Sequence, residues 1–318
     1  MEEYKWLPVA CAPDIFPAKL LTGRFGFQQG DPVMIPKGNV YNNGWGEIGF
    51  ANLTENDLHA APSWMEVCWF SLAENKFYKD RFDLAEYNIN RLLSSEIISP
   101  ADGSKAKYDF LITGFAPGGF VCLWAAGQGL VKEICLLKAR ETKIEWKEIM
   151  SEDVFTQDDF RNQKLKALLT EEQLSELNTN GIQKAWAKRF HSRYNWNPLF
   201  IGEVEPVNLR IQTFNGEREF LLFNNEFKNV PSARGIPRIL IYRWFDASGI
   251  HWAGYVYFNA EEIMEMFEKL NQFQNESLYR LQIQIDSENN NMKLFLASDK
   301  FYYEFKKCIC KIYYESAA

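Results

Sequence analysis

The 318-residue chain contains no run of about 18 apolar residues, the length that a helix needs to cross a bilayer. No membrane-spanning helix is therefore expected. The chain opens with Met1, Glu2 and Glu3 and lacks the basic and apolar regions of a signal peptide. We expect a cytoplasmic protein, or a periplasmic or lipid-anchored one if a leader was removed.

Basic clusters are also scarce. The formal net charge is -7, and the basic runs are short pieces such as Lys306-Lys307. Because nucleic-acid-binding proteins usually carry a basic face, no nucleic-acid partner is expected. The acidic balance permits a basic protein partner without requiring one.

Recognised catalytic motifs are missing. The three histidines, His59, His191 and His251, stand alone in the sequence, whereas a zinc site needs three or four well-placed ligands. There is no Gly-x-Ser-x-Gly elbow, and no glycine loop ends in Gly-Lys-Ser/Thr. We predict no catalytic residue, no cofactor and no metal.

Four carboxylates could in principle pair for acid–base chemistry. They are Glu66, Glu74, Asp80 and Asp83. Carboxylates spaced in this way across a hairpin are more often solvent-exposed or helix caps. The six cysteines are too few for a disulfide-held fold, so we expect them to be structural.

Aromatic residues, in contrast, are abundant. They make up 15% of the chain, and hydrophobic residues make up 47%. Aromatic side chains favour strands, so this composition indicates a sheet-rich globular protein. The length fits two domains or one large domain.

Several motifs occur twice in the same order. Residues 4–8 and 194–198 share the pattern Tyr-x-Trp-x-Pro. Pro62 and Pro237 are each followed seven residues later by Trp-Phe. Such repetition predicts a tandem duplication.

A third repeated segment predicts a helix start in each copy. Asp83 or Asn259 can cap the first turn, and Glu86 or Glu262 can reach back to the N–H of the cap residue. The preceding Phe82 or Phe258 can pack against an apolar residue of the first turn, as in a hydrophobic staple.

Strand pairs flank each predicted helix. The hairpins expected in the first copy join 65–72 to 76–82 and 108–115 to 120–126. Those of the second copy join 239–245 to 251–258 and 278–285 to 292–297. We predict an α+β fold of two similar units, each an antiparallel sheet with one packed helix. The units are expected at 1–148 and 191–318, joined by a helical connector at 149–190.

As a set, several motifs of this sequence resemble the bacterial domain-of-unknown-function family 2931. They include Asn-Gly-Trp-Gly at 43–46, Glu-Asn-Lys-Phe-Tyr at 74–78, Gly-Phe-Ala-Pro-Gly-Gly at 114–119 and Arg-Tyr-Asn-Trp-Asn-Pro at 193–198. The resemblance covers most of the first copy and the start of the second. It supplies no catalytic residue to carry over.

Members of that family are often encoded beside type VI secretion effectors. The resemblance therefore implies a non-enzymatic immunity protein that neutralises a cognate toxin by binding it. The candidate interaction surface consists of Trp45, Glu74, Tyr78, Pro117, Gly118 and Gly119. The glycines could also cradle an anion, but a strand rather than a helix follows them, which favours a hairpin turn.

Two alternatives stay open. The aromatic residues could form a glycan-binding platform. The chain could also be an enzyme of an unrecognised type, which would need a deep pocket with convergent titratable groups.

Overall fold

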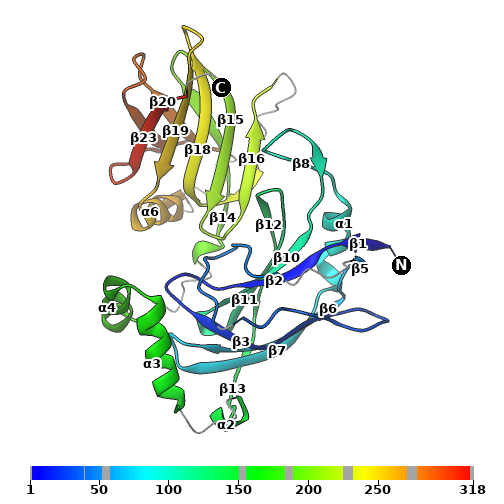
Figure 1. Ribbon diagram of the computed structural model, residues 1–318. Coiled ribbons are helices and arrows are strands. Elements are labelled where there is room, and N and C mark those ends of the chain that lie inside the picture. The colour runs from blue at the N-terminus through cyan, green and yellow to red at the C-terminus, as the bar shows by residue number, and fades with distance from the viewer. Residues whose placement is uncertain are drawn as a thin grey trace. The chain divides into compact units, whose positions relative to one another are not determined.

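The computed structural model describes residues 2–38, 40–51, 58–149, 155–182, 189–224, 232–270 and 278–315. The chain forms two compact units, Met1–Ala187 and Lys188–Ala318 (Figure 1). It is mostly β-sheet with few helices, which agrees broadly with the predicted α+β class. Within the expected connector, residues 150–154 and 183–188 lie outside the described ranges.

One sheet of the first unit has the strand order β2-β10-β11-β12. Its strands are β2 (Leu7–Cys11), β10 (Phe110–Ala116), β11 (Phe120–Gly127) and β12 (Leu130–Lys138). β2 runs parallel to β10, and the other neighbours are antiparallel. The predicted hairpin between β10 and β11 forms, and the short 3-10 turn η2 (Pro117–Gly119) closes it.

The other main sheet of this unit has the order β13-β7-β6-β3-β4. Its strands are β3 (Ala18–Gly26), β4 (Val33–Met34), β6 (Trp64–Ser71), β7 (Lys76–Asp83) and β13 (Arg140–Thr142). The predicted hairpin of β6 and β7 is confirmed. A bulge interrupts the pairing of β3 with β6 between Leu20 and Thr22.

The core of the first unit lies between these two sheets. Alternate residues of a strand face the same side, so Met65, Val67 and Trp69 of β6 all point inward and are fully buried. Leu111 and Phe115 belong to the same core from the other sheet. The expected single antiparallel sheet is therefore wrong: two sheets face each other, and one pair is parallel. A single sheet under one short helix would leave this apolar surface in water.

The helical segment of the first unit is broken and short. It consists of η1 (Ala85–Tyr87) and α1 (Ile89–Ser94). Asp83 accepts a hydrogen bond from the backbone N–H of Ala85 at 2.9 Å, but it is not the cap of α1. The predicted cap is wrong because Asn88, at φ +50°, interrupts the helix in the left-handed region. Two small pairs complete this part of the unit: β1 (Glu3–Lys5) with β5 (Leu58–Ala60), and β8 (Ile97–Ile98) with β9 (Lys105–Ala106).

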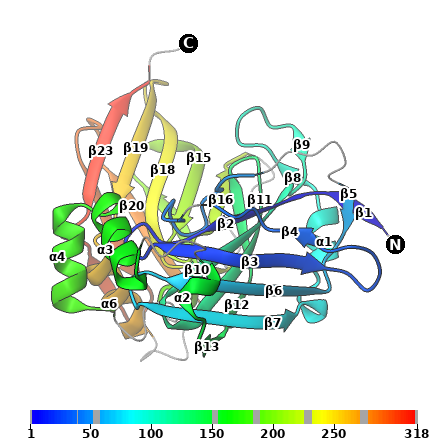
Figure 2. The same cartoon turned by 60° about the horizontal axis from the view of Figure 1, so that its bottom comes forward.

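Among the described residues of the first unit, β13 is followed by α2 (Trp146–Ile149), α3 (Gln157–Leu168) and α4 (Glu171–Asn180). A capping box between Thr170 and Gln173 begins α4, and Gly181 follows its last residue. Phe160 and Leu165 of α3 pack on Phe70 and Phe77 of the β6–β7 hairpin. Figure 2 shows α3 beside the end of β3, β6 and β7. These helices thus cover part of the outer face of this sheet, which is the face turned away from the core.

The second unit also contains two sheets within its described residues. One has the order β16-β15-β18-β19-β23, and the other β17-β14-β20-β21-β22. The first is made of β15 (Val204–Thr213), β16 (Arg218–Leu222), β18 (Pro237–Asp246), β19 (His251–Tyr257) and β23 (Ile309–Tyr314). The second is made of β14 (Arg193–Ile201), β17 (Ser232–Gly235), β20 (Tyr279–Ile285), β21 (Met292–Ala297) and β22 (Tyr302–Glu304). β14 and β20 are parallel, and both predicted hairpins are confirmed.

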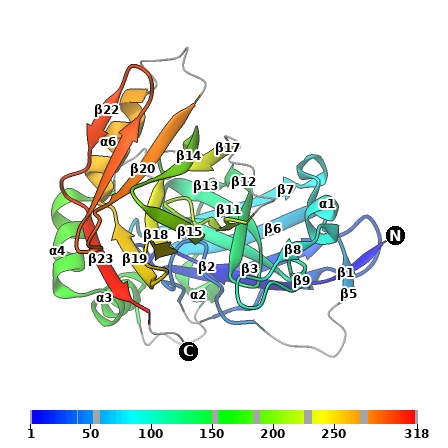
Figure 3. The ribbon, with the colours of Figure 1, turned by 90° about the horizontal axis from the view of Figure 1, so that it is seen from above.

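Helix α6 (Ala260–Leu270) closes the core of the second unit. It lies against β20 and β22 in Figure 3, and Ile263 and Phe267 are fully buried there. Asn259 caps the helix as predicted, accepting from the backbone N–H of Glu262 at 3.0 Å. The predicted return bond of Glu262 is not formed. The Glu262 carboxylate is buried and accepts from the Tyr303 hydroxyl and from backbone N–H groups at residues 306 and 307.

Candidate functional site

Five of the six predicted interaction residues meet at one corner of the first unit. Glu74 follows β6 in the turn before β7, Tyr78 lies on β7, and Pro117–Gly119 closes the neighbouring hairpin. Glu74 Oε1 accepts from the Tyr78 hydroxyl at 3.0 Å and from the Gly118 backbone N–H at 2.9 Å. Burial, together with the Glu74 carboxylate, raises the pKa of Tyr78, so its phenol stays protonated and donates.

Glycine is required at the centre of this corner. Gly119 has φ +78°, and a Cβ there would lie 2.5 Å from the carbonyl oxygen of Ala139 and 2.9 Å from the Tyr78 ring. Only a residue without a Cβ fits such a close approach at positive φ. The Glu74 Oε2 atom is buried and has no hydrogen-bond partner among the described residues. The corner is thus a closely packed, polar contact between two hairpins.

Burial limits what this group can touch. Tyr78 and Trp45 are 4% and 7% exposed, and Pro117 and Gly119 are also buried. Trp45 lies apart from the corner, packed edge-on against Trp124 with ring centroids 4.8 Å apart. Only Glu74 and Gly118 are partly exposed. Contact with a partner stays a prediction for these two residues.

The other predicted carboxylates do not converge with Glu74 on one site. Glu66 pairs with Arg24 at 2.6 Å, and Asp80 pairs with Arg140 at 3.0 Å. Each of these two carboxylates is neutralised by its own arginine. Glu66 and Asp80 line one pocket of about 430 Å³ together with Arg140, and Asp83 accepts from the Ala85 backbone N–H.

A tyrosine-lined hollow, absent from the predictions, lies on the outer face of the second unit. The hollow encloses about 310 Å³. It is lined by Ala253, Tyr255, Tyr257, Lys311, Tyr313 and Glu315. Tyr257 is 41% exposed and Tyr313 is 49% exposed. The Tyr255 and Tyr313 rings meet edge to face at 5.6 Å.

This hollow borders an open sheet edge. β23 pairs with β19 on one side and has no strand on its other side within the described part of the chain. Ile309, on the outer face of β23, is 59% exposed. The available signal in the sequence was the alternation Tyr255-x-Tyr257 and Ile309-x-Lys311-x-Tyr313. That alternation puts these side chains on one face, but it does not say whether the face is covered.

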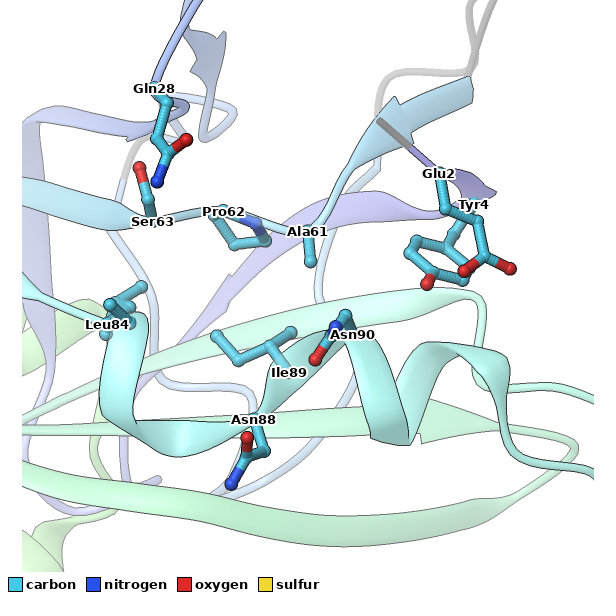
Figure 4. A pocket seen from close by; sticks show the side chains of 11 residues that line it. Glu2, Tyr4, Gln28, Ala61, Pro62, Ser63, Leu84, Asn88, Ile89 and Asn90 are labelled. Atoms are coloured by element: carbon cyan, nitrogen blue, oxygen red, sulfur yellow. The ribbon is translucent and has the colours of Figure 1, made fainter.

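A third feature is a pocket of about 320 Å³ between the start of α1 and the β1–β5 pair. Figure 4 shows amide groups of Gln28, Asn88 and Asn90 around it, with Glu2 and Tyr4 at one end. Burial and a hydrogen bond with Glu2 raise the pKa of Tyr4, so this phenol is also protonated at neutral pH. Apart from the Glu2 carboxylate, the lining offers neutral hydrogen-bonding groups and includes no histidine or lysine.

Residues 1–176 match the family described as Protein of unknown function (DUF2931). The match covers more than half of the chain, so the chain belongs to this family. It ends before the second unit begins, and the motif at 193–198 lies outside it. No curated protein and no solved structure matches the chain. No helix in the described ranges is long and apolar enough to cross a membrane.

Proposed function

We propose that this protein is a non-enzymatic binding protein whose partner is another protein. The single observation that carries the proposal is the tyrosine-lined hollow beside the open edge of β23. Tyrosine presents a large, rigid surface with a polar tip, and it is enriched among the residues that dominate binding energy. An unpaired edge strand adds backbone groups that a partner strand can pair with.

The partner class that we propose is a secreted toxin of the type VI kind, which this protein would neutralise as its immunity protein. Such a role needs a recognition surface and no catalytic constellation. The motif resemblance supports the toxin as partner, and the tyrosine hollow supports direct binding.

The test uses the full chain and the toxin encoded beside its gene, measured by isothermal titration calorimetry. We expect a tight complex, and we expect Tyr257→Ala with Tyr313→Ala to weaken it by about 2 kcal/mol or more, or roughly thirtyfold. Tyr302→Ala is the matched control, because Tyr302 is 66% exposed but belongs to the other sheet. A toxin that does not bind, or equal losses in both variants, would overturn the proposal.

A glycan-binding module is the second candidate, favoured by the same hollow. Its volume suits a small ligand, and a tyrosine face can stack on a sugar ring. Calorimetry with a set of oligosaccharides distinguishes the two functions: sugar binding that Tyr313→Ala abolishes, without toxin binding, favours this candidate.

We also propose that the two units arose by tandem duplication. The sheet orders β13-β7-β6-β3-β4 and β23-β19-β18-β15-β16 correspond strand for strand. In the other sheet of each unit, the first strand runs parallel to a strand that follows the helix: β2 pairs with β10, and β14 pairs with β20. Pro8 pairs with Leu111 in one unit, and Pro198 pairs with Leu281 in the other.

The repeated tryptophans support the same proposal. Trp6 Nε1 donates to the carbonyl oxygen of Ala60 at 3.3 Å, and Trp196 Nε1 donates to that of Gly235 at 3.1 Å. Each acceptor precedes the repeated proline, at position 62 or 237, by two residues. A crystal structure with different partners for Pro198 or Trp196 would contradict the duplication.

A further inference from the structure

The outer face of the first unit contains a second hollow, enclosing about 650 Å³. It lies between the strands β3, β6 and β7 and the segment that runs from β13 into α2. Four lysines line it: Lys19, Lys37, Lys79 and Lys143. We call it the lysine pocket. Its single acidic lining residue is Glu148.

Three of the four lining lysines, Lys37, Lys79 and Lys143, have no acidic partner among the described residues. Lysines elsewhere pair with acids, as Lys76 does with Glu141 at 2.7 Å and Lys105 with Glu96 at 2.8 Å. The lining has four lysines and one glutamate, whereas the protein as a whole carries a net charge of -7.

One of the lining lysines, Lys19, is also under the electrostatic influence of Lys164 on α3. The ammonium groups of Lys19 and Lys164 both lie 5.7 Å from the centroid of the Phe160 ring. Burial, and to a lesser degree Lys164, lowers the pKa of Lys19. A bound anion would relieve this repulsion, because a cleft lined by one sign of charge focuses the field on a ligand of the opposite sign.

The lysine pocket also has an apolar side. Leu21, Ile144 and Ile149 line it and are only partly buried against the cluster beneath α3. The volume lies within the range of small-molecule sites, and apolar walls with a few placed charges are typical of such sites. We propose that the lysine pocket binds a small amphipathic anion, with phosphate or carboxylate groups on the lysines and an apolar body on these three side chains.

The first test titrates the full chain with inorganic pyrophosphate and with citrate by calorimetry at constant ionic strength. We expect binding that Lys79→Gln with Lys143→Gln weakens about tenfold, since two charges near the ligand are lost. Lys105→Gln with Lys107→Gln removes the same charge outside the pocket and should leave binding unchanged. Glu148→Gln should tighten it. Pyrophosphate binding without citrate binding assigns phosphate as the recognised group, and the reverse assigns carboxylate.

The second test compares hexyl phosphate with inorganic phosphate. Burial of the alkyl chain should make hexyl phosphate bind at least about tenfold tighter. Equal affinities would overturn the role of the apolar side. Equal binding by the Lys79/Lys143 and Lys105/Lys107 variants, or no binding of any probe at millimolar concentration, would overturn the site itself. Circular dichroism of each variant verifies that it is folded.

Discussion

The outer face of the β13-β7-β6-β3-β4 sheet is partly covered by helices of its own unit, whereas the corresponding face of the second unit carries exposed tyrosines. In the first unit, Phe70 belongs to a buried cluster with Phe160 of α3, and the Trp146 ring lies against both. Under the proposed duplication, Phe70 corresponds to Phe245, which is 37% exposed. The two faces share strand order and pairing register but differ in what lies on them.

The two outer faces also differ in the side chains at corresponding positions. Arg81 and Arg140 of the first unit occupy the register positions of Tyr255 and Tyr313 in the second. One face therefore offers charges and the other offers aromatic rings. Because outer-face residues make few core contacts, a repeated unit can exchange them without loss of its fold. Under the proposed duplication, the two outer faces would bind different partners while the cores stay alike.

The largest expected effect tests whether the two cores are equivalent. Trp6→Ala and Trp196→Ala should each lower the free energy of unfolding by about 3–5 kcal/mol, because both side chains are fully buried. Guanidinium denaturation followed by circular dichroism measures this. Phe50→Ala, at a residue 65% exposed, is the control and should change stability by less than about 0.5 kcal/mol. If one tryptophan variant lost much less stability than the other, the two cores would not be equivalent.

The next prediction compares Glu86 and Glu262, which occupy the same position of the repeated helix-start motif. Glu262→Ala should destabilise the protein by about 2–3 kcal/mol. The substitution leaves the hydroxyl and the two backbone N–H groups that the carboxylate now binds without a hydrogen-bond acceptor. Glu86→Ala, at an exposed residue, should cost less than about 0.5 kcal/mol. The same denaturation assay compares them, and equal costs would refute the buried role of Glu262.

The third prediction compares two glycines with nearly the same φ, and the expected difference between them is about 1–2 kcal/mol. Gly119→Ala should cost about 2–3 kcal/mol, since its Cβ would meet the Ala139 carbonyl oxygen in addition to the strain of positive φ. Gly249→Ala at φ +77° has open space around its Cβ and should cost about 1 kcal/mol. Thermal unfolding of both variants measures the difference. If the costs are the same, the close packing of the Glu74–Tyr78 corner is not as described.

The smallest effect is a pH dependence confined to the first unit. Burial acts to raise the pKa of Asp80, but hydrogen bonds and charge from Arg140 outweigh it and lower the pKa overall. A lowered folded-state pKa gives stability above the unfolded value of about 4, and that stability is lost as pH falls through the folded pKa. The stability difference between wild type and Asp80→Asn should therefore shrink below roughly pH 4. A difference that stays constant from pH 7 to pH 3 in denaturant titrations would contradict this.

The hairpins were predictable because their signals are local. Alternating apolar residues and turn residues lie within a few positions of each other, as in the strand pair around Pro117–Gly119. The cap of α6 at Asn259 was predictable for the same reason. The matching cap predicted at Asp83 was wrong, because Asn88 adopts a left-handed conformation that breaks the first helix. No local sequence pattern predicts this break.

The candidate site was only partly visible in the sequence. Glu74, Tyr78 and Gly118 were selected from motifs, and the structure joins them by hydrogen bonds. Trp45 was selected in the same way, yet it packs elsewhere against Trp124. The tyrosine hollow was missed because exposure depends on which segments cover a face, and periodicity does not report that.

The sequence by itself determined the absence of recognised catalytic motifs, the two hairpins of each unit and the repeated landmarks, because each depends on residue types at short spacing. Only the tertiary structure decided that β2 pairs with β10 across about a hundred residues of chain, that each unit folds as two facing sheets, and that lysines from distant segments share one pocket. These features come from the burial of apolar surface between distant segments, and the energy of that burial depends on the whole unit rather than on any local pattern.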